Sequence, residues 1–305
     1  MAHVTALAHV ATLIANPAAP AVDGALLARA ADALPHPGGP DWLAPGIAAD
    51  LPFARPDTDL AAIAARLREA VGPAPVDICV QPAAHRRKRL FVADMDSTMI
   101  GQECIDELAD LVGCKEHVAA ITERAMRGEI AFEPALRERV ALLRGLPVEM
   151  VARVIEERIT LTPGGPALVA TMRAAGAYTC LVSGGFTLFT DRIAAMIGFD
   201  ETRANHLDVE DGRLTGTVAE PIVGREAKLA ALIELRARLG LSAAETLAVG
   251  DGANDLAMLQ EAGLGVAFHA KPKVAASAAV RLDHADLTAL LYIQGFRREA
   301  FAPEA

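Results

Sequence analysis

The chain has 305 residues, which is long enough for two or three structural units with a sizeable hydrophobic core. Its residues are 52% hydrophobic but only 4% aromatic, and its formal net charge of −10 argues against general nucleic-acid binding. No stretch of about 18 uninterrupted apolar residues occurs, so no membrane span is expected.

The cysteines and the N-terminal residues both indicate a cytoplasmic protein. The four cysteines are scattered without metal-like pairing, which favours free thiols in a reducing compartment. The apolar N-terminal stretch has no lysine or arginine before Arg29, and Asn16 and Pro17 interrupt it. It therefore lacks the pattern of a signal peptide.

Residues 1–86 are predicted to form a small N-terminal α/β domain that carries no catalytic motif. The expected elements are a strand at 3–15, a helix at 24–34, an irregular extended piece at 42–53, a helix at 60–70 and a strand at 76–80. This order resembles an ACT-type amino-acid-binding domain, which implies a regulatory role. A structural or dimerising appendage is the alternative, so homodimer formation stays open.

The most informative stretch of the chain begins at Leu90. Leu90–Ala93 is a short continuous apolar run, which is typical of a strand buried on both faces of a parallel sheet. It ends at Asp94 and Asp96, at the kind of strand end where ligands of open α/β sheets bind. Residues i and i+2 of an extended chain project to the same side, so both carboxylates can address one reacting centre. The alternative is that they only cap the next helix.

Residues 101–160 contain helical patterns and no good strand. Glycines punctuate four segments of helical apolar spacing at 103–112, 115–127, 132–143 and 148–159. Short helices inserted directly after the strand at 90–93 predict a helical cap over the strand ends.

An alternation of strands and helices begins at Leu161 and predicts a parallel sheet. The expected strands lie at 178–182, 246–249 and, as the last strand, 264–267; the expected helices lie at 165–175, 187–197, 226–239, 256–262 and 287–293. Residues 206–218 predict a hairpin whose turn is Asp211-Gly212. The predicted fold is therefore α/β, with a Rossmann-like parallel sheet formed by residues 87–100 and 161–305 and a cap at 101–160.

Three later motifs add polar groups to this sheet. Ser183-Gly184 follows a strand and opens a helix, which suits a phosphate, although Ser-Gly-Gly is also an ordinary turn. Lys228 lies near a helix start, where a cation is not favoured, so it is more interesting than the other lysines as a clamp on phosphoryl oxygens. Gly250–Asp255 (GDGAND) could also suggest a calcium loop, but it is too short and lacks the distal glutamate of an EF-hand.

Together these motifs resemble those of the haloacid dehalogenase (HAD) superfamily, in its phosphoserine phosphatase branch. The resemblance covers residues 90 to about 290 and includes the cap segments Met126–Gly128, Phe132 and Leu136–Val140. It implies a HAD core with a helical cap and a phosphatase activity. The roles that it implies are nucleophile for Asp94, general acid/base for Asp96 and metal binding for Asp251. It also implies that Asn254 contacts the phosphate or the substrate and that Asp255 supports Lys228 or a metal-bound water.

The residue types fit this chemistry. An aspartate can attack a phosphate monoester and form an aspartyl-phosphate, but it is repelled by the dianion unless cations neutralise the site. Asp94, Asp96 (through its backbone carbonyl) and Asp251 would give an oxygen-rich Mg²⁺ site. Asp96 can donate and later accept a proton if its pKa lies near the working pH.

Two cap residues narrow the range of possible substrates. Glu103 and Arg139 present an anion and a guanidinium, which can take an ammonium and, bidentately, a carboxylate. The matching positions do this in phosphoserine phosphatases, so the expected reaction is hydrolysis of O-phospho-L-serine to L-serine and phosphate, the last step of L-serine biosynthesis. The alternatives are another HAD phosphatase or phosphotransferase, using for example phosphohomoserine, and a non-enzymatic amino-acid sensor with an inactive core.

Overall fold

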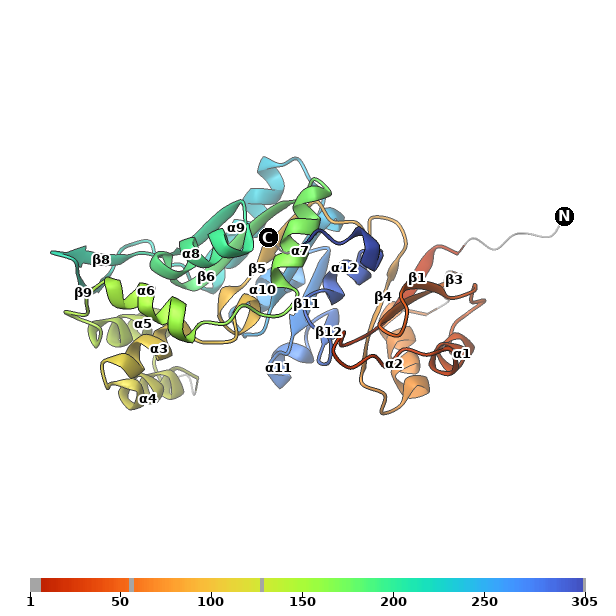
Figure 1. Ribbon diagram of the computed structural model, residues 1–305, viewed down its shortest axis with the longest axis horizontal. Coiled ribbons are helices and arrows are strands. Elements are labelled where there is room, and N and C mark those ends of the chain that lie inside the picture. Colours follow the sequence, from red (N-terminus) through yellow and green to blue (C-terminus); the bar gives the residue numbers. More distant parts are fainter. Residues whose placement is uncertain (1–6, 55–57, 127–128, 304–305) are drawn as a thin grey trace.

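The computed structural model places an N-terminal sheet domain, a central α/β core and a helical cap side by side, with the core in the middle (Figure 1). It describes residues 7–54, 58–126 and 129–303. The start of the first predicted strand and the Arg-Gly pair of the Met126–Gly128 cap segment lie outside the described residues. The predicted α/β class with a parallel sheet is confirmed.

The N-terminal domain is a four-stranded antiparallel sheet in the order β2-β3-β1-β4. Its elements are β1 (His9–Ala15), α1 (Gly24–Asp32), β2 (Asp41–Ala44), β3 (Ala48–Phe53), α2 (Leu60–Val71) and β4 (Val76–Pro82). This β-α-β-β-α-β order is that of the ferredoxin-like motif. The prediction of an irregular extended piece at 42–53 is wrong, because β2 and β3 pair there across a turn at Gly46 (φ +79°). Their alanines and prolines give little β propensity to detect.

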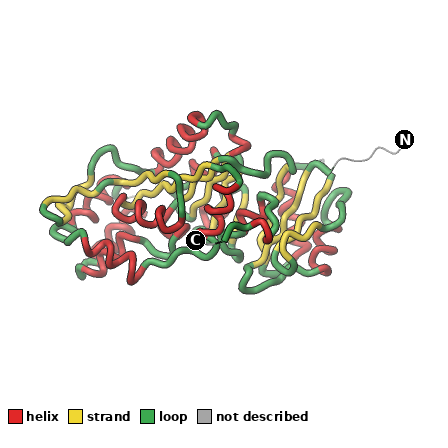
Figure 2. The backbone as a smooth tube through the Cα atoms, turned by 45° about the horizontal axis from the view of Figure 1, so that its top comes forward, coloured by secondary structure: helices red, strands yellow, loops and turns green. Residues whose placement is uncertain are grey.

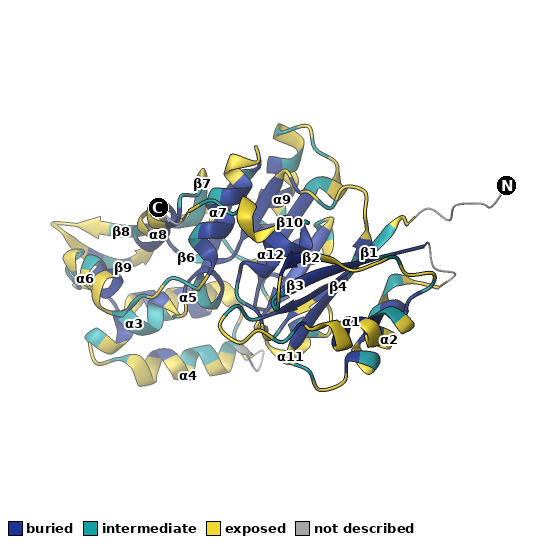
Figure 3. Ribbon diagram, turned by 45° about the vertical axis from the view of Figure 1, so that its right-hand side comes forward, coloured by how far each residue is buried: buried dark blue, intermediate teal, exposed yellow. Residues whose placement is uncertain are grey.

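The two faces of this sheet pack on different partners, as its buried strands in Figure 3 indicate. Leu13 and alternate residues face α1 and α2, whereas Ile14 joins the hydrophobic core of the central sheet. At the junction, buried Asp77 accepts hydrogen bonds from the backbone N–H groups of Asp283, His284 and Ala285 at 2.9, 3.1 and 2.8 Å. The domain is therefore fixed to the core by buried polar contacts as well as apolar ones.

The core is a six-stranded sheet in the order β12-β11-β10-β5-β6-β7, with all neighbours parallel. Its strands are β5 (Leu90–Ala93), β6 (Tyr178–Phe186), β7 (Glu201–Asn205), β10 (Thr246–Gly250), β11 (Leu264–Phe268) and β12 (Val280–Leu282). Its helices are α7 (Gly165–Ala174), α8 (Thr187–Ile197), α9 (Arg225–Arg238), α10 (Leu256–Glu261), α11 (Pro272–Ala275) and α12 (Ala289–Ile293). Helices lie on both faces of the sheet (Figure 2).

Two edge strands of this sheet were not predicted. The strand at 264–267 was expected to be the last, but β12 pairs beside it at one edge. β7 forms the other edge, where its polar sequence is stabilised by ion pairs of Arg203 with Glu201 and with Glu234 on α9, both at 2.7 Å. Charged side chains are common on edge strands and remove the apolar alternation that marks a strand.

The cap contains the four predicted helices α3 (Cys104–Leu111), α4 (Lys115–Met126), α5 (Phe132–Ala141) and α6 (Glu149–Arg158). The predicted hairpin is also present, as β8 (Leu207–Glu210) and β9 (Arg213–Val218), with positive φ at Asp211 and Gly212. It packs on the cap: Gly145 N–H donates to the Leu214 carbonyl at 2.7 Å, and Figure 1 shows it beside α5 and α6. Among the described residues, no helix has the length and apolar character to cross a bilayer.

Both connections between core and cap lie together. Ile100 and Leu161 form an antiparallel bridge, and Gly101 N–H donates to the Thr160 carbonyl at 3.0 Å. The cap is thus an insertion whose two ends are neighbours.

Candidate active site

The register of the central strands brings three polar segments together at the carboxyl ends of the strands. These segments are the residues after β5, the last residues of β6, and residues 250–255 at the end of β10, here called the β10 loop. Ala93 at the end of β5 lies beside Val249 of β10 on one side and Leu181 of β6 on the other. The residues that follow, Asp94 among them, therefore leave the sheet at the same level, which is where open α/β sheets bind ligands. Glycine is required in the β10 loop, because a β-carbon at Gly250 would lie 2.4 Å from the carboxyl carbon of Asp255.

The three segments at the carboxyl ends of the strands and the cap together enclose a cavity of about 150 Å³. Most of the predicted site residues line it, namely Asp94, Asp96, Glu103, Arg139, Ser183, Gly184, Asp251 and Asn254. The other two, Lys228 and Asp255, are fully buried behind the cavity wall. The structure therefore brings together all the residues that the sequence indicated.

Lys228 lies between two buried carboxylates. Its ammonium is 2.5 Å from Asp94 Oδ1 and 2.7 Å from Asp255 Oδ1, and the other Asp255 oxygen accepts the Gly252 N–H at 3.0 Å. Burial disfavours the charged ammonium, but the two carboxylates outweigh it and raise the pKa of Lys228. Burial and the neighbouring Asp255 raise the pKa of Asp94, and Lys228 opposes that rise. Lys228 thus fixes Asp94 in one orientation and offsets part of the local negative charge.

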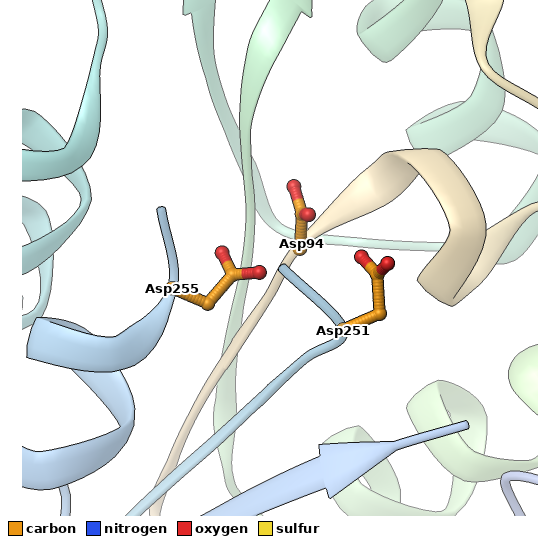
Figure 4. Close-up of side chains that lie close together, drawn as sticks. All are labelled: Asp94, Asp251 and Asp255. Atoms are coloured by element: carbon orange, nitrogen blue, oxygen red, sulfur yellow. The ribbon is translucent and has the colours of Figure 1, made fainter. Parts of the chain in front are cut away.

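Asp94, Asp251 and Asp255 converge from two loops (Figure 4). Each offers a carboxylate oxygen, all within 4.8 Å of one another, and all three residues are buried. Burial and Asp255 raise the pKa of Asp251 to about 6. One ammonium against three buried carboxylates leaves uncompensated negative charge, so the donor set fits a divalent cation with oxygen ligands. The Asp96 carboxylate is not part of this cluster, as expected if Asp96 contributes its backbone carbonyl.

The Asp96 carboxylate instead faces the cap. Oδ1 accepts the Cys104 N–H at 3.1 Å, and Oδ2 lies 3.5 Å from the Ser183 hydroxyl. Burial, with the charge of Glu103 second, raises the pKa of Asp96 to about 6. A proton can therefore enter and leave this carboxyl near neutral pH. Helix capping explains only part of the motif, since Asp94 makes no side-chain capping bond.

The phosphate-binding prediction falls on the last part of β6, which continues through Phe186 instead of ending at residue 182 as expected, with a shift in its pairing with β7 between Val182 and Phe186. The Ser183 hydroxyl accepts the Gly185 N–H at 2.8 Å, and Ser183 and Gly184 both line the cavity. Asn254 lines the cavity from the β10 loop.

Glu103 and Arg139 approach the cavity from the cap. Glu103 Oε1 accepts the Ser97 hydroxyl at 2.8 Å. Arg139 donates from Nε to the Ala135 carbonyl at 3.2 Å and from Nη1 to the Thr122 hydroxyl at 3.4 Å. Within the described part of the chain, its guanidinium has no carboxylate at ion-pair distance, so donors remain for an anionic ligand.

A model of the haloacid dehalogenase-like hydrolases matches residues 91–260. The chain belongs to this family. A phosphoserine phosphatase from Albidiferax ferrireducens is 49% identical over 208 residues, which are 67% of this chain and 88% of that protein. A HAD family hydrolase from Salmonella enterica serovar Typhi superposes with a TM-score of 0.85 at 28% identity, over 96% of this chain and 100% of that one. A phosphoserine phosphatase described as a phospho-aspartyl intermediate analogue gives a TM-score of 0.62 at 40% identity, over 68% and 98%.

Sequence reasoning missed one charged residue of this HAD hydrolase's cavity. Lys271 lines it from the loop after β11. The preceding apolar run and the following Pro272 indicate only the end of a strand and a break before the next helix, and no spacing along the chain indicates a contact between this segment and the β10 loop. Ile105, Phe132 and Leu136 supply an apolar wall on the cap side.

Proposed function

We propose that the protein is a Mg²⁺-dependent phosphoserine phosphatase, which hydrolyses O-phospho-L-serine to L-serine and phosphate. The observation that carries this proposal is the joint lining of one cavity by Asp94 and Asp251 of the core and Glu103 and Arg139 of the cap. The names of the relatives support the same substrate. Release of free L-serine makes this the last step of L-serine biosynthesis, and the four free thiols support a reducing cytoplasm.

In the proposed reaction, Asp94 attacks phosphorus while Asp96 gives its proton to the departing serine oxygen. The bond between phosphorus and that oxygen breaks, and an aspartyl-phosphate forms. Asp96, now ionised, takes a proton from the water that attacks the aspartyl-phosphate, and phosphate release restores Asp94. Lys228 holds Asp94 in place, and Ser183-Gly184 with Asn254 hold the phosphoryl oxygens. A divalent cation on Asp94, Asp251 and the Asp96 carbonyl would neutralise the phosphate charge.

The cap supplies the recognition of the amino acid. Glu103 takes the ammonium of phosphoserine, and Arg139 takes its carboxylate in a bidentate fork. This assignment separates phosphoserine from phosphate esters that lack either group.

The deciding experiment is phosphate release across a panel of phosphoserine, phosphothreonine, phosphohomoserine, phosphoglycolate and small sugar phosphates, with and without Mg²⁺. We expect phosphoserine to have the highest kcat/KM. A higher value for phosphohomoserine or a sugar phosphate would assign another HAD activity, and no release from any ester would favour the amino-acid sensor.

Removal of divalent metal should abolish turnover, and Mg²⁺ should restore it. Ca²⁺ should restore little, because it prefers more ligands at longer distances and would engage both oxygens of Asp94. Mg²⁺ should also raise the melting temperature of chelator-treated wild type but not of Asp251→Asn. Full activity with Ca²⁺, or an equal thermal shift in the variant, would contradict this metal site.

Arg139→Lys should lower kcat/KM for phosphoserine about ten- to a hundred-fold more than for a substrate without the α-carboxylate, because the fork is lost and charge-assisted hydrogen bonds contribute roughly 1.5–3 kcal/mol. Glu103→Gln should likewise penalise phosphoserine over phosphoglycolate, which has no amino group. The measurement is a ratio of kcat/KM values, since damage to the cap would lower both. Equal losses on both substrates would make these residues structural.

For residues 1–86, the ferredoxin-like strand order supports an ACT-like regulatory domain. A titration of activity and melting temperature with free amino acids tests this role. The absence of any response would favour the structural or dimerising alternative, which size measurement in solution would then examine.

A further inference from the structure

The side chains of the cavity wall supply fewer cations than carboxylates. Its wall carries four carboxylates, from Asp94, Asp96, Glu103 and Asp251, but only two cationic side chains, from Arg139 and Lys271. Any phosphate monoester that enters is a dianion near neutral pH, and the chain as a whole has a net charge of −10. Even with a divalent cation on Asp94 and Asp251, a phosphate dianion therefore approaches a protein whose net negative charge repels it.

The three cations near the reacting centre are not equivalent. Lys228 is fully buried and shared by two carboxylates, so it is not accessible to an approaching ligand. Arg139 is on the cap. Lys271 belongs to the core, is exposed, and has no ion-pair partner among the described residues. It is therefore the solvent-facing cation on the core side of the cavity.

The backbone places Lys271 firmly beside the metal-binding loop. Its N–H donates to the Asp251 carbonyl at 3.3 Å, and Pro272 after it begins α11 with a fixed φ. A side-chain substitution at this position leaves the backbone hydrogen bond in place.

We propose that Lys271 is an entrance cation, which attracts the phosphate dianion into the cavity by long-range electrostatics and holds it weakly before the reaction. Such a charge changes substrate capture and its dependence on salt rather than the chemical step. The inference rests on the proposed phosphatase activity, but it applies to any phosphate monoester that the enzyme hydrolyses.

The test compares Lys271→Gln with Lys273→Gln, which removes the same charge two residues further along and does not touch the cavity. Holoenzyme with saturating Mg²⁺ is assayed on phosphoserine and on p-nitrophenyl phosphate from about 20 mM to about 500 mM ionic strength, which shortens the Debye length to a few ångströms. We expect Lys271→Gln to lower kcat/KM about tenfold at low salt and less than about twofold at high salt, with kcat almost unchanged. Lys271→Glu should lose more, Lys271→Arg should retain most of the wild-type value, and Lys273→Gln should match wild type.

A second measurement does not depend on turnover. Inorganic phosphate should bind to Lys271→Gln more weakly than to wild type, measured as an inhibition or dissociation constant. This difference in affinity should also decrease as the salt concentration rises. Equal behaviour of the two glutamine variants, or a loss in Lys271→Gln that is the same at low and high salt, would overturn the inference. Failure of wild type to hydrolyse any phosphate ester would instead refute the proposed function, so the two failures are distinguishable.

Discussion

Asp94→Asn should abolish turnover while leaving the fold intact. Asparagine is nearly isosteric with aspartate, but its amide cannot attack phosphorus as a carboxylate does. Loss of a nucleophile typically lowers kcat by several orders of magnitude, so we expect a decrease of at least about 10⁴-fold. Initial rates of phosphate release measure the effect, and circular dichroism and thermal unfolding check the fold.

Asp211→Asn is the matched control. Asp211 lies in the hairpin turn at φ +49°, a conformation that asparagine also adopts readily, and it is exposed. This variant should retain wild-type kcat. Substantial steady-state activity in a clean Asp94→Asn preparation would rule out the aspartyl-phosphate route.

Lys228→Met should reduce both activity and stability. The side chain is fully buried, and its removal leaves the Asp94 and Asp255 carboxylates buried without their counter-ion. Breaking a buried ion pair by removing one partner typically costs about 3–5 kcal/mol in the free energy of unfolding. Denaturant unfolding of the metal-free protein measures this cost, because a bound cation would compensate part of the charge.

A double-mutant cycle with Asp255→Asn separates the charge effect from packing. Once Asp255 is neutral, Lys228→Met leaves one fewer carboxylate without a counter-ion and should cost less than it does in wild type. Additive changes in unfolding free energy would mean that the ion pair at 2.7 Å contributes no coupling. Activity should remain reduced in the double variant, since Asp94 still lacks its ammonium partner.

The sequence was most informative where chemistry requires several residue types close together. Asp94 and Asp96 follow a fully apolar strand, and the β10 loop contains glycines at positions where a β-carbon would clash with Asn254 or Asp255. Both segments could therefore be recognised from their local sequence. Their convergence followed from parallel pairing, which sets both strand ends at one level. The cap helices were predictable because their apolar spacing is regular and glycines separate them.

Elements that form only through contacts with other segments of the chain were not predictable from the sequence. β7 is polar, and its ion pairs, one of which reaches Glu234 on α9, form only in the folded chain. β12 has only three residues and, among the described strands, pairs with β11 alone. β2 and β3 contain three alanines, two aspartates and a proline, which have low β propensity, and these segments become strands by pairing in the N-terminal sheet. Lys271 reaches the cavity only through the contact of its loop with Asp251, a relation between segments that spacing along the chain does not encode.

The paired cap connections at Ile100 and Leu161 make the cap a separable module, and the proposed recognition of the amino acid would be separable with it. Inserted segments with adjacent ends can be exchanged without breaking the host sheet, so a cap from a relative with another preference could be transplanted onto this core. The module is not one continuous segment, however, because the β8–β9 hairpin packs on the cap through Gly145 and Leu214. A successful transplant must therefore carry residues 207–218 together with 101–160, and evolution of new preferences in this chain would have to keep both segments compatible.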